Sequence, residues 1–205
     1  MNSAIDLIKK HVNLNGYSKS KGFIGFSERD QKFSFEIIMR VISFFLSYFE
    51  GQLHKFKLVT SLHFSDSFEE LKNDYDMSKE QYDLLLNIQK AGWASLVDYN
   101  KFGVDYDSDE YQDQIELLYT AFSEYEISND NIKLLEQLLI AVFSIDGVDG
   151  HCFLISEELG IIIYPHEDTG FGVIYFKGKE AEKLGKKFLL SSGSIQGIMS
   201  KIGTS

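Results

Sequence analysis

The chain has 205 residues, a formal net charge of −11 and a single cysteine, Cys152. A chain of this length can bury enough surface to fold without disulfide bonds, and its acidity argues against nucleic acid as the direct ligand, because phosphate binding needs clustered Lys and Arg. The most apolar window, Phe33–Phe49, is interrupted by Glu36 and Arg40, so we expect a core element and no membrane span. The amino terminus lacks the pattern of a secretory signal, which favours a cytoplasmic location.

The negative charge is concentrated in the middle of the chain. Residues 1–65 carry 9 basic and 5 acidic side chains, residues 66–126 carry 4 and 16, and residues 127–205 carry 7 and 10. A surface of one charge sign attracts and orients partners of the opposite sign. The middle segment therefore predicts a basic partner.

The first third of the chain alternates helical and extended patterns. Apolar residues at helical spacing after a serine predict a short helix over Ser3–Val12. Gly16–Gly25 is typical of a loop, with a short extended piece at Phe23–Phe26. Apolar positions four residues apart predict a buried helix from Asp30 to Glu50, although its β-branched and aromatic residues leave a pair of strands as the alternative. Strict alternation over His54–Phe64 predicts one half-buried strand.

The acidic middle segment is helical by pattern. We expect a short helix over Ser65–Tyr75. Ser78 opens a capping-box signature before a helix that continues to Val97, with Gly92 either weakening or breaking it. Apolar spacing predicts a further helix over Ile115–Tyr125. The next helix is expected to begin at residue 128 or 129 and to reach residue 143, where a DGVDG turn follows.

The last part of the chain predicts a three-stranded meander and a closing helix. The expected strands are Phe153–Ser156, Ile161–Tyr164 and Phe171–Phe176, joined by glycine-containing turns. Lys179–Leu190 has helical spacing, with lysines toward the end of the helix where they complement its dipole. Residues 191–205 are rich in Ser and Gly and are expected to fray.

These elements predict an α+β fold with a helical amino-terminal and middle region, a carboxyl-terminal antiparallel β-meander and a closing helix. We expect residues 1–205 to form a single compact domain. The alternative is a subdivision into a mainly helical part, 1–145, and a part that holds the meander and last helix, 146–205. In either case the meander is expected to pack against Phe33–Phe49 and the last helix.

The acidic run Asp105–Asp113 has three interpretations. Its carboxylates match a calcium loop of the EF-hand type at Asp105, Asp107, Asp109, Asp113 and Glu116, but Glu110 stands where that loop needs glycine for its sharp turn. A solvated acidic loop is the second interpretation. The third is a surface for a basic protein, with Tyr99, nearby tyrosines and Trp93 as rigid anchors. The candidate partner-binding residues here are Asp105, Tyr106, Asp107, Asp109, Glu110, Tyr111 and Asp113.

The turn after the second meander strand places an imidazole beside two carboxylates, in His166, Glu167 and Asp168. Such a set can act as a general base or bind a metal, with help from His151, which predicts a small hydrolase or metal-dependent enzyme as an alternative function. Consecutive side chains on a tight turn splay to different sides, so capping of backbone donors beside Pro165 is the more economical interpretation. We also assign the three turn residues to the edge of the partner-binding surface.

Other catalytic signatures are missing from the sequence. The remaining histidines show no HExxH, HxH or CxxC spacing, and there is no Walker loop, GxGxxG helix start or GxSxG elbow. Cys152 lies in an apolar strand with only His151 as a basic neighbour, so we expect an inert buried thiol. We therefore expect a protein that is not an enzyme and that carries no cofactor or metal.

In size, acidity and aromatic content, with 17 Phe and 11 Tyr, the chain resembles bacterial immunity proteins, including those of contact-dependent growth-inhibition systems. The segment IIIYPHEDTGFGVIYF is similar to the strand-turn-strand ends of small bacterial domains. The resemblance implies an antitoxin-like protein in the cytoplasm that binds and occludes a cognate basic toxin, a nuclease domain, without touching nucleic acid or membrane. Immunity proteins vary widely in sequence, so the resemblance assigns no residue.

Overall fold

The computed structural model describes residues 3–102, 108–166 and 168–203. The α-helices are α1 Ala4–His11, α2 Phe35–Tyr48, α3 Phe68–Tyr75, α4 Lys79–Lys90, α5 Asp109–Thr120, α6 Ile132–Ser144 and α7 Gly178–Ser192. The strands are β1 Phe23–Arg29, β2 Lys57–Thr60, β3 His63–Ser65, β4 Ser95–Val97, β5 Ser123–Glu126, β6 Cys152–Ser156, β7 Ile161–His166, β8 Gly170–Tyr175 and β9 Ile198–Ile202.

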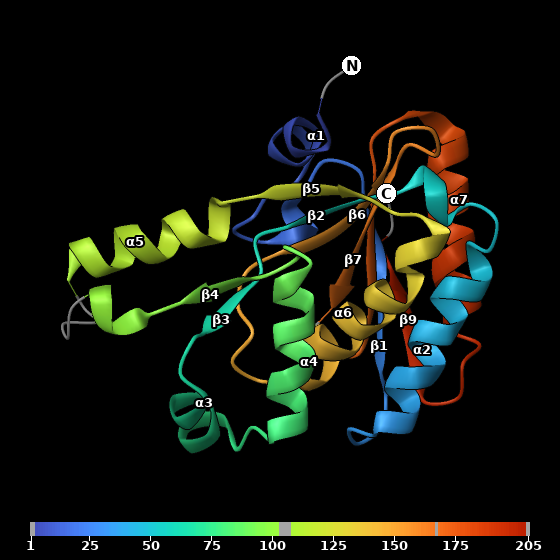
Figure 1. Ribbon diagram of the computed structural model, residues 1–205. Coiled ribbons are helices and arrows are strands. Elements are labelled where there is room, and N and C mark those ends of the chain that lie inside the picture. Colours follow the sequence, from blue (N-terminus) through green and yellow to red (C-terminus); the bar gives the residue numbers. More distant parts are fainter. Residues whose placement is uncertain (1–2, 103–107, 167, 204–205) are drawn as a thin grey trace.

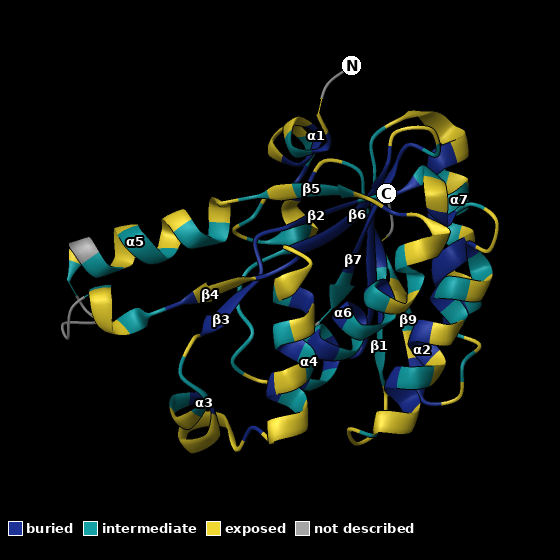
Figure 2. Cartoon of the chain, viewed as in Figure 1, coloured by how far each residue is buried: buried dark blue, intermediate teal, exposed yellow. Residues whose placement is uncertain are grey.

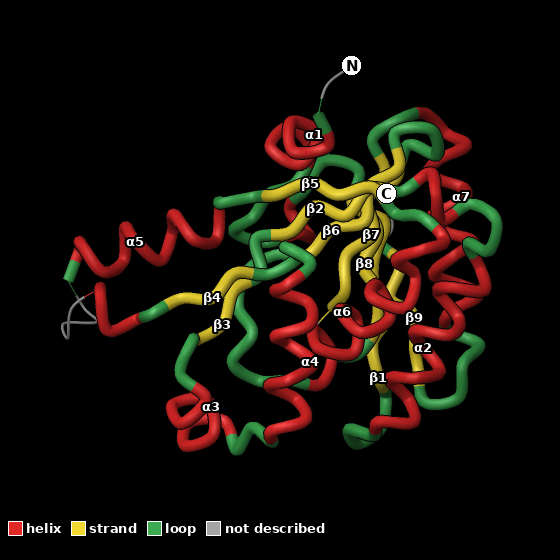
Figure 3. Tube along the Cα trace, viewed as in Figure 1, coloured by secondary structure: helices red, strands yellow, loops and turns green. Residues whose placement is uncertain are grey.

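Seven of these strands form one antiparallel sheet in the order β5-β2-β6-β7-β8-β1-β9 (Figures 1 and 3). The predicted meander is its centre, since β6, β7 and β8 pair in sequence order. The α+β class, the helical middle region and the closing helix α7 are confirmed. Strands from both parts of the chain, 1–145 and 146–205, share this sheet.

The alternation of side chains along the central strands gives the sheet two buried faces. Leu58 and Ile163 join the larger apolar cluster, to which α2, α4, α6 and α7 contribute. Their neighbours Val59 and Ile162 point the other way and join a smaller cluster with α1. Successive residues in a strand face opposite sides of the sheet, so each central strand is buried on both sides.

Aromatic side chains connect the helical layer to the meander. The ring of Phe45 on α2 lies 4.9 Å from that of Phe171 on β8, and Phe49 lies 5.3 Å from Phe188 on α7, measured between ring centroids. The expected contact of Phe33–Phe49 with the meander and last helix is confirmed, and the alternative of two strands in that segment is wrong. Across the described ranges, no helix has both the length and the apolar character needed to cross a membrane.

The single strand expected over His54–Phe64 is instead two strands in two sheets. The chain leaves the large sheet after Thr60, whose hydroxyl oxygen accepts from the Leu62 N–H at 3.1 Å and donates to the Trp93 carbonyl at 3.3 Å. These local bonds replace ladder pairing and turn the chain toward β3. The prediction of a half-buried strand was also wrong, because Leu58 and Val59 are both fully buried.

Two helix boundaries in the middle segment differ from the prediction. Helix α4 ends at Lys90 because Gly92 adopts a left-handed φ of 82°, and the following residues form β4. Helix α5 begins at Asp109, where the Ser108 hydroxyl caps it, and ends well before Tyr125. The segment around Tyr125 is the edge strand β5, which pairs with β2.

The expected fraying of residues 191–205 was wrong for most of that segment. Residues 198–202 form β9, which pairs along its whole length with Gly25–Arg29 of β1. Ile198 is buried, and the Lys201 ammonium pairs with Glu28 on β1. The partner strand lies almost the whole chain away in sequence, so the local Ser/Gly composition gave no signal of this pairing.

Candidate functional site

A group of short elements extends from one side of the large sheet (Figure 1). Strands β3 and β4 pair in parallel, and α3, α5 and a 3-10 helix at Tyr99–Phe102 surround them. We call β3, β4, α3, α5 and this 3-10 helix the acidic arm, because all but β3 belong to the strongly acidic segment 66–126. Figure 2 shows that α5 is exposed or half-buried along its described length, in contrast to the buried sheet.

Ser61 and Gly150 fix the arm to the sheet. The Ser61 hydroxyl donates to the Tyr119 carbonyl at the end of α5, at 2.7 Å, and accepts from the His151 N–H at 3.1 Å. Gly150 has a φ of 102°, and a Cβ there would lie 2.4 Å from the Ser61 carbonyl oxygen. Only glycine permits this backbone approach, so the segment before β6 lies directly against the start of the arm.

A pocket of about 370 Å³ lies between the arm and the segment before β6. Ligand pockets run from roughly 300 to 1,000 Å³, so this one suits a single extended group. It is lined by His63, Ser65, Glu70, Leu71, Asp74, Tyr75, Tyr99, Asn100, Tyr111, Ile115, Tyr119, Gly147 and Asp149. In the described part of the chain, none of the lining residues is Lys or Arg, so three carboxylates and four tyrosines dominate its chemistry.

His63 and Asp149 both line this pocket and come from different segments of the chain. Their backbones form an isolated antiparallel β-bridge of two reciprocal hydrogen bonds, each with an N to O distance of 2.9 Å. The Nδ1 of His63 lies 3.0 Å from the Ser61 carbonyl. A carbonyl can only accept, so Nδ1 of His63 carries a proton and donates in this bond. The Tyr119 hydroxyl donates to Asp149 Oδ1 at 3.3 Å, and its ring meets that of His63 edge-on.

The carboxylates of the pocket are held by neutral donors. Glu70 accepts from the Ser65 hydroxyl at 2.7 Å and from the Asn100 side-chain amide at 2.9 Å. Asp74 lies exposed one helical turn further along α3. No lysine or arginine of the described chain forms an ion pair with Glu70, Asp74 or Asp149. Their negative charge is therefore not neutralised internally and attracts a cation.

Three tyrosines of the pocket, Tyr75, Tyr99 and Tyr119, keep their protons at neutral pH. Burial, with the nearby Asp149 carboxylate, raises the pKa of Tyr119 to about 12, and the same two causes raise the pKa of Tyr75 and Tyr99. The Tyr99 hydroxyl is shielded from solvent and has no hydrogen-bond partner among the described residues. Its charged and polar neighbours are Asp149 and the hydroxyls of Tyr75, Tyr111 and Tyr119, all of which line the pocket.

The outer face of α5 combines negative charge with exposed apolar surface. Asp109, Asp113 and Glu116 are exposed, and within the described residues none of them forms an ion pair. Leu117, directly after Glu116, is 68% exposed. The inner face carries Tyr111, which lines the pocket. A helix with these two faces presents charge to solvent and aromatic surface to the pocket.

The predicted partner-binding residues are distributed over this helix and its surroundings. Asp105, Tyr106 and Asp107 lie outside the described residues, as does the side chain of Glu110, whose backbone belongs to α5. Asp109 and Asp113 are on the exposed face, and Tyr111 is in the pocket.

The calcium-loop interpretation does not fit the backbone of α5. Asp109, Asp113 and Glu116 all lie in one continuous helix, whereas an EF-hand loop supplies ligands at those positions from a turning backbone. Among the described residues, no group of three or more His, Cys, Asp or Glu side chains is placed to hold a metal ion.

Trp93 is not the surface anchor that the sequence suggested. It is 3% exposed and belongs to the larger apolar cluster. It follows Gly92, where α4 ends and the chain turns inward, so its ring packs against that of Tyr125 at 6.1 Å. The exposed apolar side chains of the arm are Tyr75, Leu96 and Leu117 instead.

The His166 turn lies in a different environment. His166 is the last residue of β7, its ring stacks on Phe26 at 4.6 Å, and its Nδ1 accepts from the Asp168 N–H at 3.3 Å. Glu167 lies outside the described residues. The His166 side chain therefore caps a backbone donor, as the more economical interpretation of this turn predicted. The partners of His151, by contrast, are Tyr17, Tyr119 and other rings that do not contact His166.

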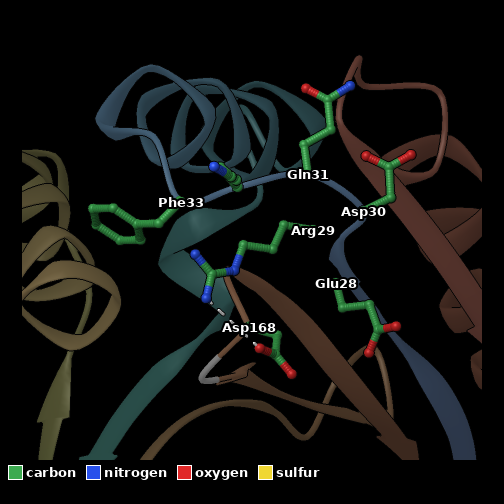
Figure 4. Close-up of a pocket in the computed structure, with 7 residues that line it drawn as sticks. Glu28, Arg29, Asp30, Gln31, Phe33 and Asp168 are labelled. Carbon is green, nitrogen blue, oxygen red and sulfur yellow. Dashed lines mark ion pairs between the residues drawn. The ribbon is translucent and has the colours of Figure 1, made fainter.

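Beside this turn is an open pocket of about 670 Å³ with a mixed lining (Figure 4). Arg29 and Asp168 face each other at 4.0 Å, and the Arg29 guanidinium also lies 5.4 Å from the centre of the Phe33 ring. Asp168 therefore already has a cation beside it. The pocket of the acidic arm and this one share no lining residue, so the structure places the two predicted sets in separate sites.

Cys152 and His151 are structural. Cys152 is buried, and burial raises the pKa of its thiol to about 12, which keeps it protonated and unreactive. The Tyr17 hydroxyl lies 2.6 Å from Nδ1 of His151, and burial lowers the pKa of this imidazole. The phenol and the imidazole therefore share one hydrogen bond, which ties the loop before β1 to the start of β6.

Sequence reasoning missed the central residues of the arm pocket. His63, Glu70 and Asp149 come from three separate segments, and long-range contacts such as the bridge between His63 and Asp149 bring the third segment in. One signal was present, since Gly150 sits within the DGVDG turn and marks a close backbone approach. That signal does not reveal which segment it approaches.

Comparison with known proteins gives no relative for this chain: no family model matches it, and neither do the curated proteins or the solved structures compared with it.

Proposed function

We propose that the chain is an antitoxin-like immunity protein that binds a basic toxin domain, a nuclease, through its acidic arm and so blocks the toxin's own substrate site. The observation that carries this proposal is the arm itself, where an acidic tyrosine-lined pocket adjoins a helix with exposed carboxylates and exposed Leu117. Nucleases present clustered cations where they bind phosphate. A surface of opposite charge that covers those cations competes directly with nucleic acid.

Two features of the arm support a role in binding a protein. Charged rims steer association, while apolar and tyrosine side chains at the centre supply most of the binding energy. The arm has both, with exposed carboxylates on α5 and the exposed side chains Tyr75, Leu96 and Leu117. The pocket also does not favour catalysis by Ser65. Its hydroxyl donates to Glu70 at 2.7 Å, so its proton is not directed at His63, as activation of a serine nucleophile by that histidine would require.

The proposal predicts a gene for a basic toxin domain directly beside the gene for this chain, and the test is neutralisation of that domain. Purified chain is mixed with that domain, and nuclease activity and binding are measured. We expect the chain to abolish the activity at equimolar ratio. The double reversal Asp113→Lys with Glu116→Lys, on the outer face of α5, is expected to weaken binding at least about tenfold, because it removes two attractive charges and adds two repulsive ones.

The matched control is Glu50→Lys with Glu157→Lys, which makes the same change in net charge at exposed positions outside the arm. This variant should bind nearly as well as the unaltered chain. An equal loss of toxin binding in both variants would mean that binding depends only on the net charge of the chain and not on the arm. No loss in the α5 variant would remove the arm from the interface, and a toxin that stays active with excess chain would refute the proposed function.

A further inference from the structure

We infer that the pocket of the acidic arm accepts one arginine side chain of the protein partner, whose guanidinium lies among the tyrosine rings and bonds to the pocket carboxylates. This inference rests on the proposed function, since it names the group by which the partner is held. It assigns a role to His63, Tyr99 and Asp149, which lie deeper in the arm than the acidic residues of α5.

The lining matches a cation that is flat as well as charged. Tyr75, Tyr99, Tyr111 and Tyr119 supply aromatic faces, which attract cations through their negative π-surfaces. Glu70, Asp74 and Asp149 supply carboxylate acceptors without an internal cation. A carboxylate cluster alone would attract any dissolved cation, but the combination with aromatic walls favours an organic cation over a hydrated metal ion.

Within organic cations, the geometry favours guanidinium over ammonium. Guanidinium is planar, stacks on aromatic rings, and carries five N–H donors that can reach several acceptors at once. The carboxylate acceptors come from two segments, with Glu70 and Asp74 on α3 and Asp149 in the segment before β6. Ammonium is more strongly hydrated and carries three donors, so it loses more on entering a pocket of about 370 Å³ and satisfies fewer acceptors.

The Tyr99 hydroxyl is a second, independent indication of a ligand. It is buried without a hydrogen-bond partner among the described residues, although buried polar groups are almost always paired. Its neighbours are Asp149 and the hydroxyls of three other pocket tyrosines. Its oxygen can therefore accept a hydrogen bond from a ligand that enters the pocket. A guanidinium brings such a donor.

The closing experiment uses the full-length protein and three small probes: N-acetyl-arginine amide, its uncharged isostere N-acetyl-citrulline amide, and N-acetyl-lysine amide. Each is titrated against the isotope-labelled protein, and the backbone amide signals are followed by NMR. We expect the arginine probe to shift the signals of His63, Asn100 and Asp149 with a saturating curve. Citrulline should bind about tenfold more weakly or not at all, because it lacks the charge. Lysine should fall between them.

A matched pair of variants distinguishes the effect of a pocket carboxylate from that of the overall negative charge of α3. Asp74→Asn removes a lining carboxylate and should weaken the arginine probe about fivefold. Glu69→Gln on the same helix removes an exposed carboxylate that does not line the pocket and should leave the affinity unchanged. Equal binding of citrulline and arginine, equal effects of the two variants, or no saturable shift with arginine would each overturn the inference.

The partner distinguishes failure of this inference from failure of the proposed function. In the toxin complex, one Arg→Ala change on the toxin should couple to Asp74→Asn in a double-mutant cycle. A toxin that is neutralised without any such coupled arginine refutes the inference and leaves the proposed function standing. A pocket that binds the arginine probe in a chain that does not bind the toxin refutes the proposed function, and with it the assignment of the arginine to that partner.

Discussion

The buried hydroxyl of Tyr99, which is unpaired among the described residues, lowers the stability of the fold. A buried, unpaired polar atom destabilises a folded protein by about 1–3 kcal/mol relative to a paired one. Tyr99 carries such an atom in the described structure, and its ring packs against Phe102 and His63. A phenylalanine ring at this position could make the same packing contacts. The hydroxyl is therefore the part of the residue that packing does not explain.

Replacing Tyr99 by Phe should raise stability and weaken ligand binding at the same time. We expect the free energy of unfolding to rise by about 1 kcal/mol, because the unpaired hydroxyl is removed, while the arginine probe binds less tightly. Urea denaturation and the NMR titration measure the two effects. Tyr82→Phe is the control, since that hydroxyl donates to the Asp66 carbonyl at 2.8 Å and its loss should lower stability by about 1 kcal/mol. A Tyr99→Phe protein that is less stable than the unaltered chain would contradict the unpaired state of the hydroxyl.

His151 should make the fold less stable in mild acid. Burial and the nearby His63 lower the pKa of His151 below its ordinary value of 6.5. As the pH falls through 6.5, the unfolded chain takes up a proton at this site and the folded chain does not, so the stabilisation is complete above that pH and declines below it. The urea midpoint should therefore fall between about pH 7.5 and about pH 5.5, and should fall less in His151→Gln.

The control for this pH dependence is His54→Gln, which alters an exposed histidine. The variant should show the same decline in urea midpoint as the unaltered chain. If His151→Gln declines as steeply as the unaltered chain, then His151 is not the group responsible. A steeper decline would mean that protonation of His151 stabilises the fold, opposite to the expected sign.

At the scale of elements, β9 is the clearest test of a feature that sequence did not predict. A chain that ends at Gly197 lacks β9, exposes the unpaired edge of β1 and loses the buried Ile198. We expect a lower urea midpoint, because a ladder and an apolar side chain are lost, and self-association through the free strand edge. Sedimentation velocity measures the association.

A chain that ends at Gly203 retains all of β9 and is the control. It should match the unaltered chain in urea midpoint and in sedimentation. If the shorter chain ending at Gly197 also matched, then β9 would contribute nothing to stability and the disposable tail expected from its Ser/Gly composition would be correct.

The elements that sequence predicted well are those whose signals are local. The N-caps Ser3, Ser67 and Ser78 mark the starts of α1, α3 and α4, and their hydroxyls accept from backbone N–H groups as expected. The meander was predictable from its turns. The division between β2 and β3 was not, because the alternation of side chains continues through Ser61 and Leu62 while the backbone leaves the sheet.

The candidate site was predicted only in its outer part. Acidic composition identified the segment of α5, including Asp109, Tyr111 and Asp113, because charge can be counted along a chain. The pocket depends on the bridge between His63 and Asp149, which lie far apart in sequence. A contact of that kind follows from the path of the whole chain, and no local pattern encodes it.

At the scale of the whole molecule, charge is separated between the arm and the rest of the chain, and this predicts how association should depend on salt. Raising the salt from ~0.01 M to ~0.15 M shortens the Debye length from about 30 Å to about 8 Å. We expect the association rate with the basic toxin domain to fall at least about tenfold over this range, with a much smaller change in the dissociation rate. Stopped-flow or surface-based kinetics separate the two rates. A salt effect confined to dissociation would contradict steering by the arm.

Helix α5 has one further consequence, which concerns how partner choice can change. Its described side chains are all exposed or half-buried, and two residues after its last turn the chain enters the sheet as β5. Substitutions at exposed positions usually change stability by less than about 0.5 kcal/mol. The exposed residues of the outer face of α5 can therefore be changed one by one while the sheet and its helices stay folded, so variants of this chain can present a different charged surface without first having to become more stable.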